Sequence, residues 1–343
     1  MQYSDKCNSD ECKLSKNTRN KIPISVNLVV TTKCNYSCRF CFGHFKQLDS
    51  TPRDCSILEI PKLLAEAGCK KLTLGGGEPI LSPKLLELLK VAKKVGLTTC
   101  VVTNGNMITK ERMMALSHYL DWIAISIDSF FEYIEIKLGR GNGGHVSQCI
   151  KVASWAHDLG INLKVNSVIT SLNYSENMME QILSIKPDRW KVFQLLQIKG
   201  ENTESTKDLV IPEEEFQYFM NNHKSIKNVG IDFVYETIDD MESSYIMMLP
   251  DGRFFSNHGG KYIIGKKTIF EAGVLVALNE VGWDEEKFRR RGGYYQWGVK
   301  KQSCSENVRE SVQKIRVEYS TDSNLLSCKD NIHSNKIIGG LVE

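Results

Sequence analysis

Strand-like and helix-like segments alternate from about residue 23 to residue 196, and this alternation constrains the possible fold more than any other feature of the chain. Such a series indicates parallel strands joined by right-handed crossovers, as in a doubly wound sheet or a whole or partial barrel. Periodicity does not choose between these folds. The strands are predicted at 24–30, 71–74, 97–103, 122–127, 161–169 and 189–197, and the helices at 57–67, 83–95, 110–119, 146–159 and 176–185. The second helix is predicted to have Ser82 as its N-cap and Pro83 as its first residue.

The rest of the chain divides into an extension and two tails. Residues 201–300 show weaker alternation and more aromatic and charged residues, and we predict that they close the open side of the alternating domain, residues 23–200. Residues 1–22 are predicted to be a flexible N-terminal tail and residues 301–343 a mobile C-terminal tail, because both segments are polar.

Composition excludes several classes of function. The 343 residues carry a net charge of only +3 without a block of like charges, so no nucleic-acid or membrane partner is predicted. No stretch of 18 apolar residues exists and the first twenty residues are polar, which predicts a cytoplasmic protein. The 11 cysteines are expected to be reduced in a chain of this length. Four of them are interpreted as unconstrained thiols: Cys7, Cys12, Cys304 and Cys328.

Three cysteines, Cys34, Cys38 and Cys41, lie within eight residues, separated first by three residues and then by two. A four-iron cluster usually takes four cysteine ligands. The next cysteine is Cys55, so one iron would stay open for a substrate or cosubstrate. A zinc site is the weaker alternative, because zinc favours paired Cys-x-x-Cys units with a fourth ligand. The spacing therefore predicts an iron–sulfur cluster that takes part in chemistry.

Two glycine-rich segments are candidates for ligand binding. Residues 75–79, Gly-Gly-Gly-Glu-Pro, follow the second strand, and in parallel α/β folds ligands bind at the carboxyl ends of strands. Glycines there let the backbone approach a ligand closely. Residues 139–144 lack the strand and the glycine spacing of a dinucleotide site, so a flexible loop is the alternative. Arg140 in that segment is a candidate because a guanidinium binds a carboxylate through two parallel hydrogen bonds.

Cationic side chains share a face on the fifth and sixth predicted strands. Alternation places Lys164 with Asn166 on one strand and Arg189 with Lys191 on the other, and Lys71 begins the second strand. Inside a barrel such charges need anionic partners, and acidic residues are sparse nearby. The pattern predicts a bound polyanion such as a triphosphate. A solvent-exposed face is the alternative, which is less expected for parallel strands covered by helices.

The cysteine run, with Phe40 before its last cysteine, resembles the signature of the radical S-adenosylmethionine (SAM) enzymes, and residues 76–79 resemble their SAM-binding motif. Over roughly residues 23–300 the chain is similar to the viperin family. The resemblance implies a partial (βα)6 barrel with a C-terminal extension, a [4Fe–4S] cluster, SAM as cosubstrate and an external electron donor such as flavodoxin or ferredoxin. The segments that carry it are 25–27, 34–42, 125–130, 139–141, 164–169, 189–194, 200–202 and 291–293.

The resemblance also implies a reaction and its residues. A nucleoside triphosphate, typically CTP, would lose its 4′ hydrogen to a deoxyadenosyl radical and then its 3′ hydroxyl as water, and one electron would complete the 3′-deoxy-3′,4′-didehydro nucleotide, an antiviral chain terminator. The implied cluster ligands are Cys34, Cys38 and Cys41. The implied SAM-binding residues are Phe40, Gly76, Gly77, Glu78, Asn104, Ser126 and Arg140. The implied nucleotide-binding residues are Asn27, Lys71, Lys164, Asn166, Arg189, Lys191 and Tyr245, of which Lys164 and Tyr245 are the catalytic candidates.

Three departures from the family pattern leave the nucleobase open. Gly75 stands where a serine is expected, Gly43 is inserted before His44, and an extra residue near Asn257 leaves Lys261 as the candidate for a family lysine. UTP and GTP therefore stay alternatives to CTP. A peptide-modifying radical SAM enzyme is disfavoured because residues 200–300 contain no cysteine for further clusters. A noncatalytic cluster-bearing regulator is disfavoured by the intact glycine motif and the cationic strands.

Overall fold

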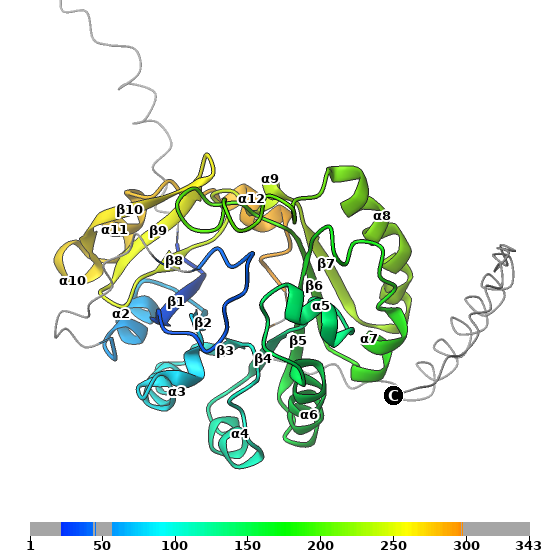
Figure 1. The fold of residues 1–343 in the computed structure, drawn as a ribbon. Helices are drawn as coiled ribbons and strands as arrows, with labels where there is room; N and C mark the ends of the chain where they lie inside the picture. Colours follow the sequence, from blue (N-terminus) through cyan, green and yellow to red (C-terminus); the bar gives the residue numbers. More distant parts are fainter. Residues whose placement is uncertain (1–21, 44, 46–56, 296, 298–343) are drawn as a thin grey trace, which may run out of the picture. The chain divides into compact units, whose positions relative to one another are not determined.

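The computed structural model describes residues 22–43, 45, 57–295 and 297. The two predicted tails, apart from Ile22, and the thiols assigned to them lie outside these residues. Within the described residues, one ten-stranded sheet forms the centre of the fold, in the order β10-β9-β8-β1-β2-β3-β4-β5-β6-β7 (Figure 1). No helix among these residues is both long enough and apolar enough to cross a membrane.

All six predicted strands are present, and each pairs with the next in parallel. They are β1 (Ser25–Thr31), β2 (Lys71–Gly76), β3 (Thr98–Thr103), β4 (Trp122–Ser126), β5 (Asn162–Ile169) and β6 (Arg189–Gln194). The five predicted helices are α2 (Ile60–Glu66), α3 (Leu85–Lys94), α4 (Lys110–Ser117), α6 (His145–Asp158) and α7 (Met179–Ile185). Two short helices were not predicted, η1 (Pro79–Leu81) and α5 (Glu132–Lys137).

Apolar spacing explains why these segments pack as they do. Helix α3 buries Leu85, Leu88 and Leu89, which lie three and four residues apart on one stripe of the helix. The prediction that Ser82 caps this helix was wrong, because the N-cap is Lys84 and no side chain caps it. The Ser82 hydroxyl instead accepts a hydrogen bond from the Lys84 N–H in the turn before the helix.

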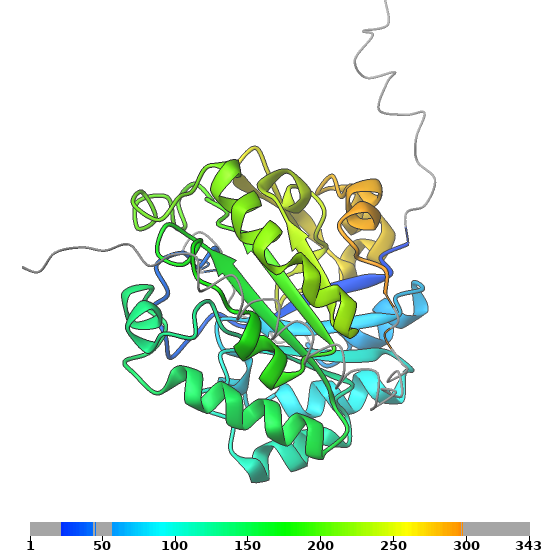
Figure 2. The same cartoon turned by 90° about the vertical axis from the view of Figure 1, so that its right-hand side faces the viewer.

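Residues 201–297 prolong the same sheet at both of its ends. Strand β7 pairs in parallel with β6, whereas β8 pairs in parallel with β1 and leads into the antiparallel pair β9 and β10. Figure 2 shows α7 and α8 on the outer side of β6 and β7. The strands are β7 (Asp232–Glu236), β8 (Met247–Met248), β9 (Arg253–His258) and β10 (Lys261–Thr268). The helices are α8 (Glu213–His223), η2 (Lys224–Val229), α9 (Ile238–Met241), α10 (Ile269–Ala272), α11 (Val274–Asn279) and α12 (Glu285–Arg290).

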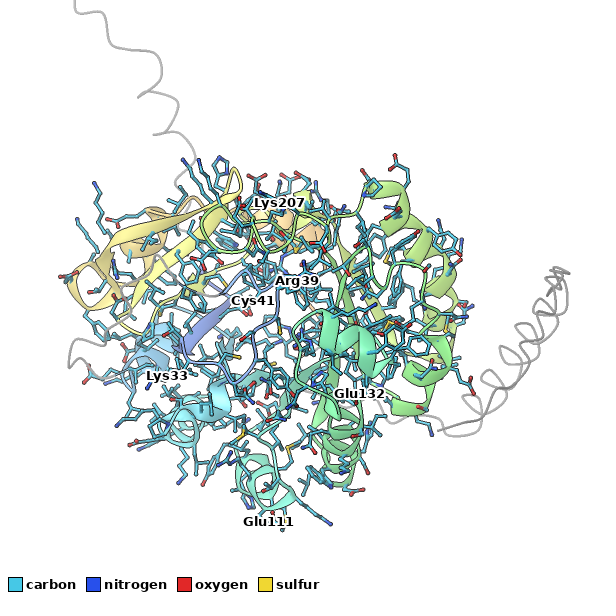
Figure 3. The ribbon with its side chains drawn as sticks, viewed as in Figure 1. Lys33, Arg39, Cys41, Glu111, Glu132 and Lys207 are labelled. Carbon is cyan, nitrogen blue, oxygen red and sulfur yellow. The ribbon has the colours of Figure 1, made fainter. Side chains whose placement is uncertain are left out.

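The loop that follows β1 carries the three cysteines, and it lies among the carboxyl ends of the parallel strands. In Figure 3, Arg39 and Cys41 of this loop lie near the centre of the view, with the strands around them. Because β1 is hydrogen-bonded to β2 on one side and β8 on the other, the start of the loop is fixed by both neighbours.

Candidate active site

Residues 32–43, here called the cysteine loop, are held by backbone hydrogen bonds from the segments that pack on them. The Glu78 N–H donates to the Lys33 oxygen over 2.8 Å, and the Arg39 N–H donates to the Leu138 oxygen over 2.8 Å. On the outer side, the buried Asn202 amide donates to the Phe40 oxygen over 2.9 Å. These hydrogen bonds define the path of the loop.

Two glycine segments approach the cysteine loop so closely that a side chain would not fit. A Cβ on Gly77 would lie 2.2 Å from the Lys33 backbone oxygen, and a Cβ on Gly139 would lie 2.3 Å from the Ser37 oxygen. Gly139 also has a φ of +80°, a conformation that favours glycine. Gly75, in contrast, has open space where its Cβ would be.

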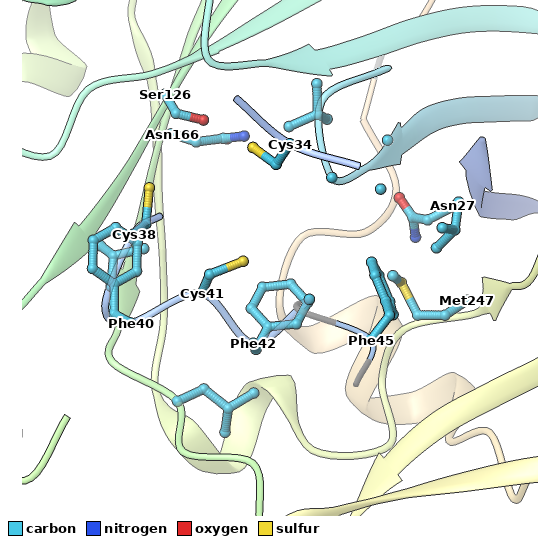
Figure 4. A pocket seen from close by; sticks show the side chains of 18 of the residues that line it. Asn27, Cys34, Cys38, Phe40, Cys41, Phe42, Phe45, Ser126, Asn166 and Met247 are labelled. Carbon is cyan, nitrogen blue, oxygen red and sulfur yellow. The ribbon is translucent and has the colours of Figure 1, made fainter. Parts of the chain in front are cut away.

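A cavity of about 310 Å³ lies against the cysteine loop. Figure 4 shows the sulfur atoms of Cys34, Cys38 and Cys41 around this space, with Ser126 and Asn166 on one side of it. The predicted SAM-binding residues that line it are Phe40, Gly76, Gly77, Glu78, Asn104, Ser126 and Arg140, and the predicted nucleotide-binding residues that line it are Asn27, Asn166 and Tyr245. The cavity thus brings both predicted sets together beside the cysteines.

Glu78 connects the glycine motif to the end of β3. Its buried carboxylate accepts hydrogen bonds from the Thr103 hydroxyl over 2.7 Å, the Asn104 N–H over 2.8 Å and the Ile80 N–H over 3.1 Å. Burial raises the pKa of Glu78, and these three donors act against that shift. The Asn104 side chain in turn donates to Asn35 in the cysteine loop over 2.8 Å.

Arg140 is buried and already bound to two carboxylates. Its Nε lies 2.6 Å from Asp128 and 3.4 Å from Glu135, and its guanidinium lies 5.3 Å from the Phe40 ring centroid. Burial, followed by the neighbouring Asp128, raises the pKa of Glu135 to about 8. Since Nε takes up the carboxylates, the two terminal nitrogens of Arg140 are the ones available for a ligand in the cavity.

The two cavity amides that were predicted to bind the nucleotide have different surroundings. Asn27 donates to the Ile246 oxygen over 3.3 Å, which ties β1 to the chain before β8. Asn166 has a buried side-chain oxygen without a hydrogen-bond partner among the described residues. An unsatisfied buried acceptor costs free energy, so this oxygen could accept a hydrogen bond from a molecule in the cavity.

The cationic residues lie on the interior face of the sheet. Lys164 is two residues before Asn166 on β5, and Lys71 is two residues before the cavity residue Thr73 on β2, so each cation shares the inward face. Arg189 and Lys191 are opposite Lys164 and Asn166 in the register of β5 and β6. All four cations are buried, so they do not form a solvent-exposed face. Among the described residues, the cavity is not lined by any of the four.

The expectation that acidic partners are sparse was wrong for two of the four cations. Strand β7 supplies Asp232, which pairs with Arg189, and Glu236, which pairs with Lys191. The Arg189 guanidinium also donates to the Gly292 oxygen over 2.9 Å. A polyanion is therefore not needed to neutralise Arg189 and Lys191.

Lys71 and Lys164 have no carboxylate partner within the described part of the chain. The Lys71 ammonium contacts the Tyr295 hydroxyl and lies 4.2 Å from that ring's centroid, and Lys164 lies 5.7 Å from the same centroid. Arg189 lies 4.0 Å from it. Burial lowers the pKa of Lys71 to about 8, and the nearby Lys164 acts in the same direction.

Several residues of the site were not predicted as site residues from the sequence. Asp232 and Glu236 are four residues apart on one strand, and side chains alternate between the two faces of a strand. The alternation of residues 232–236 would therefore have placed both on one face. Arg291 was noted within a family segment but was given no role, and it pairs with Glu236 over 2.9 Å. Asp128 and Asn202 also lie in family segments, 125–130 and 200–202, but were given no role, because their roles arise from contacts across more than ten residues of chain.

Comparisons with known proteins agree with this geometry. The profile of the Radical SAM superfamily matches residues 28–184. The crystal structure of Streptococcus suis SuiB bound to S-adenosylmethionine has a similar fold, with a TM-score of 0.55 at 16% identity over 68% of this chain and 60% of that one. The anSMEcpe structure with bound AdoMet and Cp18Cys peptide has a TM-score of 0.56 at 14% identity over 88% and 98% of the two chains. At such identities the likeness shows the fold alone.

The fold, the three-cysteine loop and the matching profile define a radical SAM protein, as predicted. Closer relatives are named S-adenosylmethionine-dependent nucleotide dehydratases. The one from Flammeovirga pacifica is 38% identical over 81% of this chain and 97% of its own length, and the one from Siniperca chuatsi is 36% identical over 80% and 79%. The one from Lacinutrix mariniflava is 38% identical over 88% of this chain, which spans 63% of that protein's length. The chain belongs to this nucleotide dehydratase family, the viperin family of the sequence motifs.

Membership of the superfamily implies a [4Fe–4S] cluster and SAM, and the residues present fit both. The three cysteines are free and line one cavity, so they would supply three of the four ligands that a [4Fe–4S] cluster usually takes and leave one iron open for SAM. No three described side chains are placed to share a single metal ion, and in a four-iron cluster each cysteine binds a different iron. The missing side chain of Gly77 lets the glycine motif pack directly on the backbone of the cysteine loop, and Gly76, Gly77 and Glu78 of this motif line the same cavity as the cysteines.

Proposed function

We propose that this chain is a radical SAM lyase that removes water from a nucleoside triphosphate and produces its 3′-deoxy-3′,4′-didehydro form. CTP is the first candidate, and UTP and GTP are the alternatives. The names of the relatives support a nucleotide as the substrate. The observation that carries the proposal is that residues of the cysteine loop share one cavity with Asn27, Asn166 and Tyr245.

The residues of the cavity divide between the two molecules that have to meet there. Cys34, Cys38 and Cys41 would hold the cluster, and the terminal nitrogens of Arg140 would bind the SAM carboxylate. When bound, the cluster and SAM supply a 5′-deoxyadenosyl radical as the hydrogen acceptor. The residues of the chain then bind SAM and the nucleotide, orient them toward each other and exclude water.

The nucleotide would extend from the cavity toward the cationic residues. Lys71 and Lys164 lie on the same inward face as cavity residues, so a triphosphate that reaches past Asn166 meets their ammonium groups. These two cations lack carboxylate partners among the described residues, and the phosphate oxygens of a triphosphate would pair with them instead. Tyr245 lines the cavity and would contact the ribose. Lys164 is the proposed proton donor as the 3′ hydroxyl leaves, since a lysine ammonium is a donor with three protons.

The reaction needs electrons from outside the chain, and we propose a flavodoxin or ferredoxin as the donor. Cys34 is the exposed member of the three cysteines, and the neighbouring Lys33 and Asn35 are exposed as well. The protein can therefore approach a donor at this edge of the cysteine loop.

The experiment incubates the anaerobic, reconstituted enzyme with SAM, a reductant and each of the four ribonucleoside triphosphates in turn. One triphosphate is expected to stimulate 5′-deoxyadenosine formation and to be converted to a product lighter by one water. With the preferred nucleotide deuterated at C4′, the label is expected in 5′-deoxyadenosine, whereas deuterium at C3′ or C5′ stays in the nucleotide. Transfer from another carbon, or equal deoxyadenosine formation without any nucleotide, would contradict the proposed function.

A further inference from the structure

Four side chains from separate parts of the chain form one buried ion cluster at the edge of the cavity. Glu236, Lys191, Arg291 and Tyr245 are here called the Glu236 cluster. The Glu236 carboxylate pairs with the Lys191 ammonium, accepts from Arg291 over 2.9 Å and accepts from the Tyr245 hydroxyl over 2.5 Å. Lys191 also donates to the Tyr245 oxygen over 2.8 Å. The side chains of Glu236, Lys191 and Arg291 are at most 9% exposed, so water screens these contacts little.

The contacts of Tyr245 determine which part of it can meet a ligand. Its hydroxyl proton goes to Glu236 and its oxygen accepts from Lys191, while the Arg291 guanidinium lies 3.7 Å from the ring centroid. Because Tyr245 also lines the cavity, the ring is the part that faces the bound molecule. The hydroxyl is held by the ion cluster and is not free to donate to a substrate.

Glu236 therefore touches every other member of the cluster, although it does not line the cavity itself. We propose that Glu236 is a positioning residue for the nucleotide site, which keeps Lys191 charged, aligns Lys191 and Arg291, and fixes the Tyr245 ring before any nucleotide enters. This inference rests on the proposed function, because it assumes that the cationic residues bind a triphosphate.

The groups that face Lys191 show what the carboxylate has to balance. Arg189 from β6, Lys164 from β5 and Arg291 after α12 surround it with positive charge, and Glu236 from β7 opposes them. Burial lowers the pKa of Lys191 most, the three cations lower it further, and Glu236 raises it. Lys191 and Arg291 in turn hold the pKa of Glu236 below its usual value, so the carboxylate is ionised.

Removing the negative charge of Glu236 while keeping its size should therefore change how many protons are taken up when the nucleotide binds. In Glu236→Gln the amide can still accept from Tyr245, but Lys191 loses the counter-charge that raises its pKa, so we expect it to release its proton more readily in the empty site. A triphosphate would then have to bring that proton back when it binds. The variant is expected to bind the nucleotide about tenfold or more weakly, with the loss smaller at lower pH, and to take up as much as one more proton per nucleotide than the wild type.

The test is calorimetry of CTP binding to the anaerobic, cluster-loaded protein in two buffers of different ionisation enthalpy at one pH. UTP and GTP replace CTP if CTP does not bind. The control is Glu285→Gln, which removes a carboxylate paired with Arg289 on the surface of α12 and should leave affinity and proton uptake at wild-type values. Glu236→Asp keeps the charge and is expected to keep the wild-type proton count. In steady state, Glu236→Gln should raise KM far more than it lowers kcat.

Each outcome bears on the proposal in a defined way. Wild-type affinity and wild-type proton uptake in Glu236→Gln would overturn it, and so would an extra proton taken up by Glu236→Asp. If Glu236→Gln does not fold, the proton count and KM of Glu236→Asp decide. A wild-type protein that binds none of the triphosphates would refute the proposed function and this inference with it, whereas nucleotide binding that is indifferent to Glu236 refutes the inference alone.

Discussion

Replacing Lys164 by methionine separates nucleotide binding from folding, because this cation stands apart from the carboxylates of the site. Its side chain is 9% exposed, and its neighbours include the Tyr295 ring at 5.7 Å but no carboxylate of the described residues. Methionine has a similar length and fills a similar space without the charge. Lys164→Met therefore removes one ammonium group and leaves no carboxylate unpaired.

The expected magnitudes follow from these contacts. A charge-assisted hydrogen bond to a phosphate contributes about 1.5–3 kcal/mol, so CTP affinity should fall by about 10- to 150-fold. The free energy of unfolding should stay the same or increase, because burying an ammonium without a partner is unfavourable. Lys191→Met is the matched comparison. It leaves Glu236 with Arg291 as its remaining cation, and breaking a buried pair in this way should cost roughly 3 kcal/mol of stability.

Two measurements on the same preparations decide the matter. Calorimetry gives the affinity for CTP, and urea unfolding gives the stability. We expect Lys164→Met to be stable but weakly binding, and Lys191→Met to be both less stable and weakly binding. The reasoning is refuted if Lys164→Met binds CTP as tightly as the wild type, or if it loses as much stability as Lys191→Met.

Three further predictions concern the cysteine loop and the core. Alanine at all three cysteines of the loop should abolish the brown absorbance and bound iron of the reconstituted protein, whereas alanine at the buried Cys69 should not. Gly77→Ala should lower cluster content, because its Cβ would lie 2.2 Å from the Lys33 oxygen, and Gly75→Ala, with open space at its Cβ, should keep it; equal iron content in the two would show that the close approach does not matter. Burial lowers the pKa of His223 from 6.5 to about 4, so the unfolded chain binds the proton first and stability should fall as pH drops from 6.5 to 4. In His223→Gln, the urea midpoint should fall less between pH 6.5 and pH 4, because the free energy of unfolding loses the pH dependence of about one proton. The same pH dependence in the variant and the wild type would show that His223 does not cause the loss of stability.

Much of the fold could be predicted from local patterns, because each strand and helix of residues 23–196 has its own periodicity. The predictions fail where tertiary contacts, and not the local sequence pattern, determine where a helix begins or whether it forms. Ser82 has a good N-cap side chain, yet its hydroxyl bonds within the preceding turn and the helix starts later. Helix α5 is too short for a hydrophobic stripe, and its place is set by contacts with the cysteine loop, such as the Arg39 N–H with Leu138 just after the helix.

The site shows the same division between local and distant signals. The positions of Cys34, Cys38 and Cys41 around one space follow from their spacing alone. The inward direction of Lys164 and Lys191 follows from strand alternation. The carboxylate partners of Arg189 and Lys191 did not follow, because the neighbour of β6 is a strand that begins 43 residues further along, and no local pattern tells which strand will lie beside which. The mixed content of residues 200–300 concealed β7, and with it Glu236.

The cysteine loop and the Glu236 cluster are built from different stretches of the chain, and this has a consequence for how damage would show itself. Most contacts of the loop come from residues 77–208, with one more from the Tyr262 hydroxyl to the Phe42 oxygen, whereas the Glu236 cluster needs residues 236, 245 and 291. A substitution confined to the Glu236 cluster would leave these contacts of the cysteine loop in place and disturb only the nucleotide side of the cavity. We expect such a variant to consume reductant and cleave SAM without converting the nucleotide.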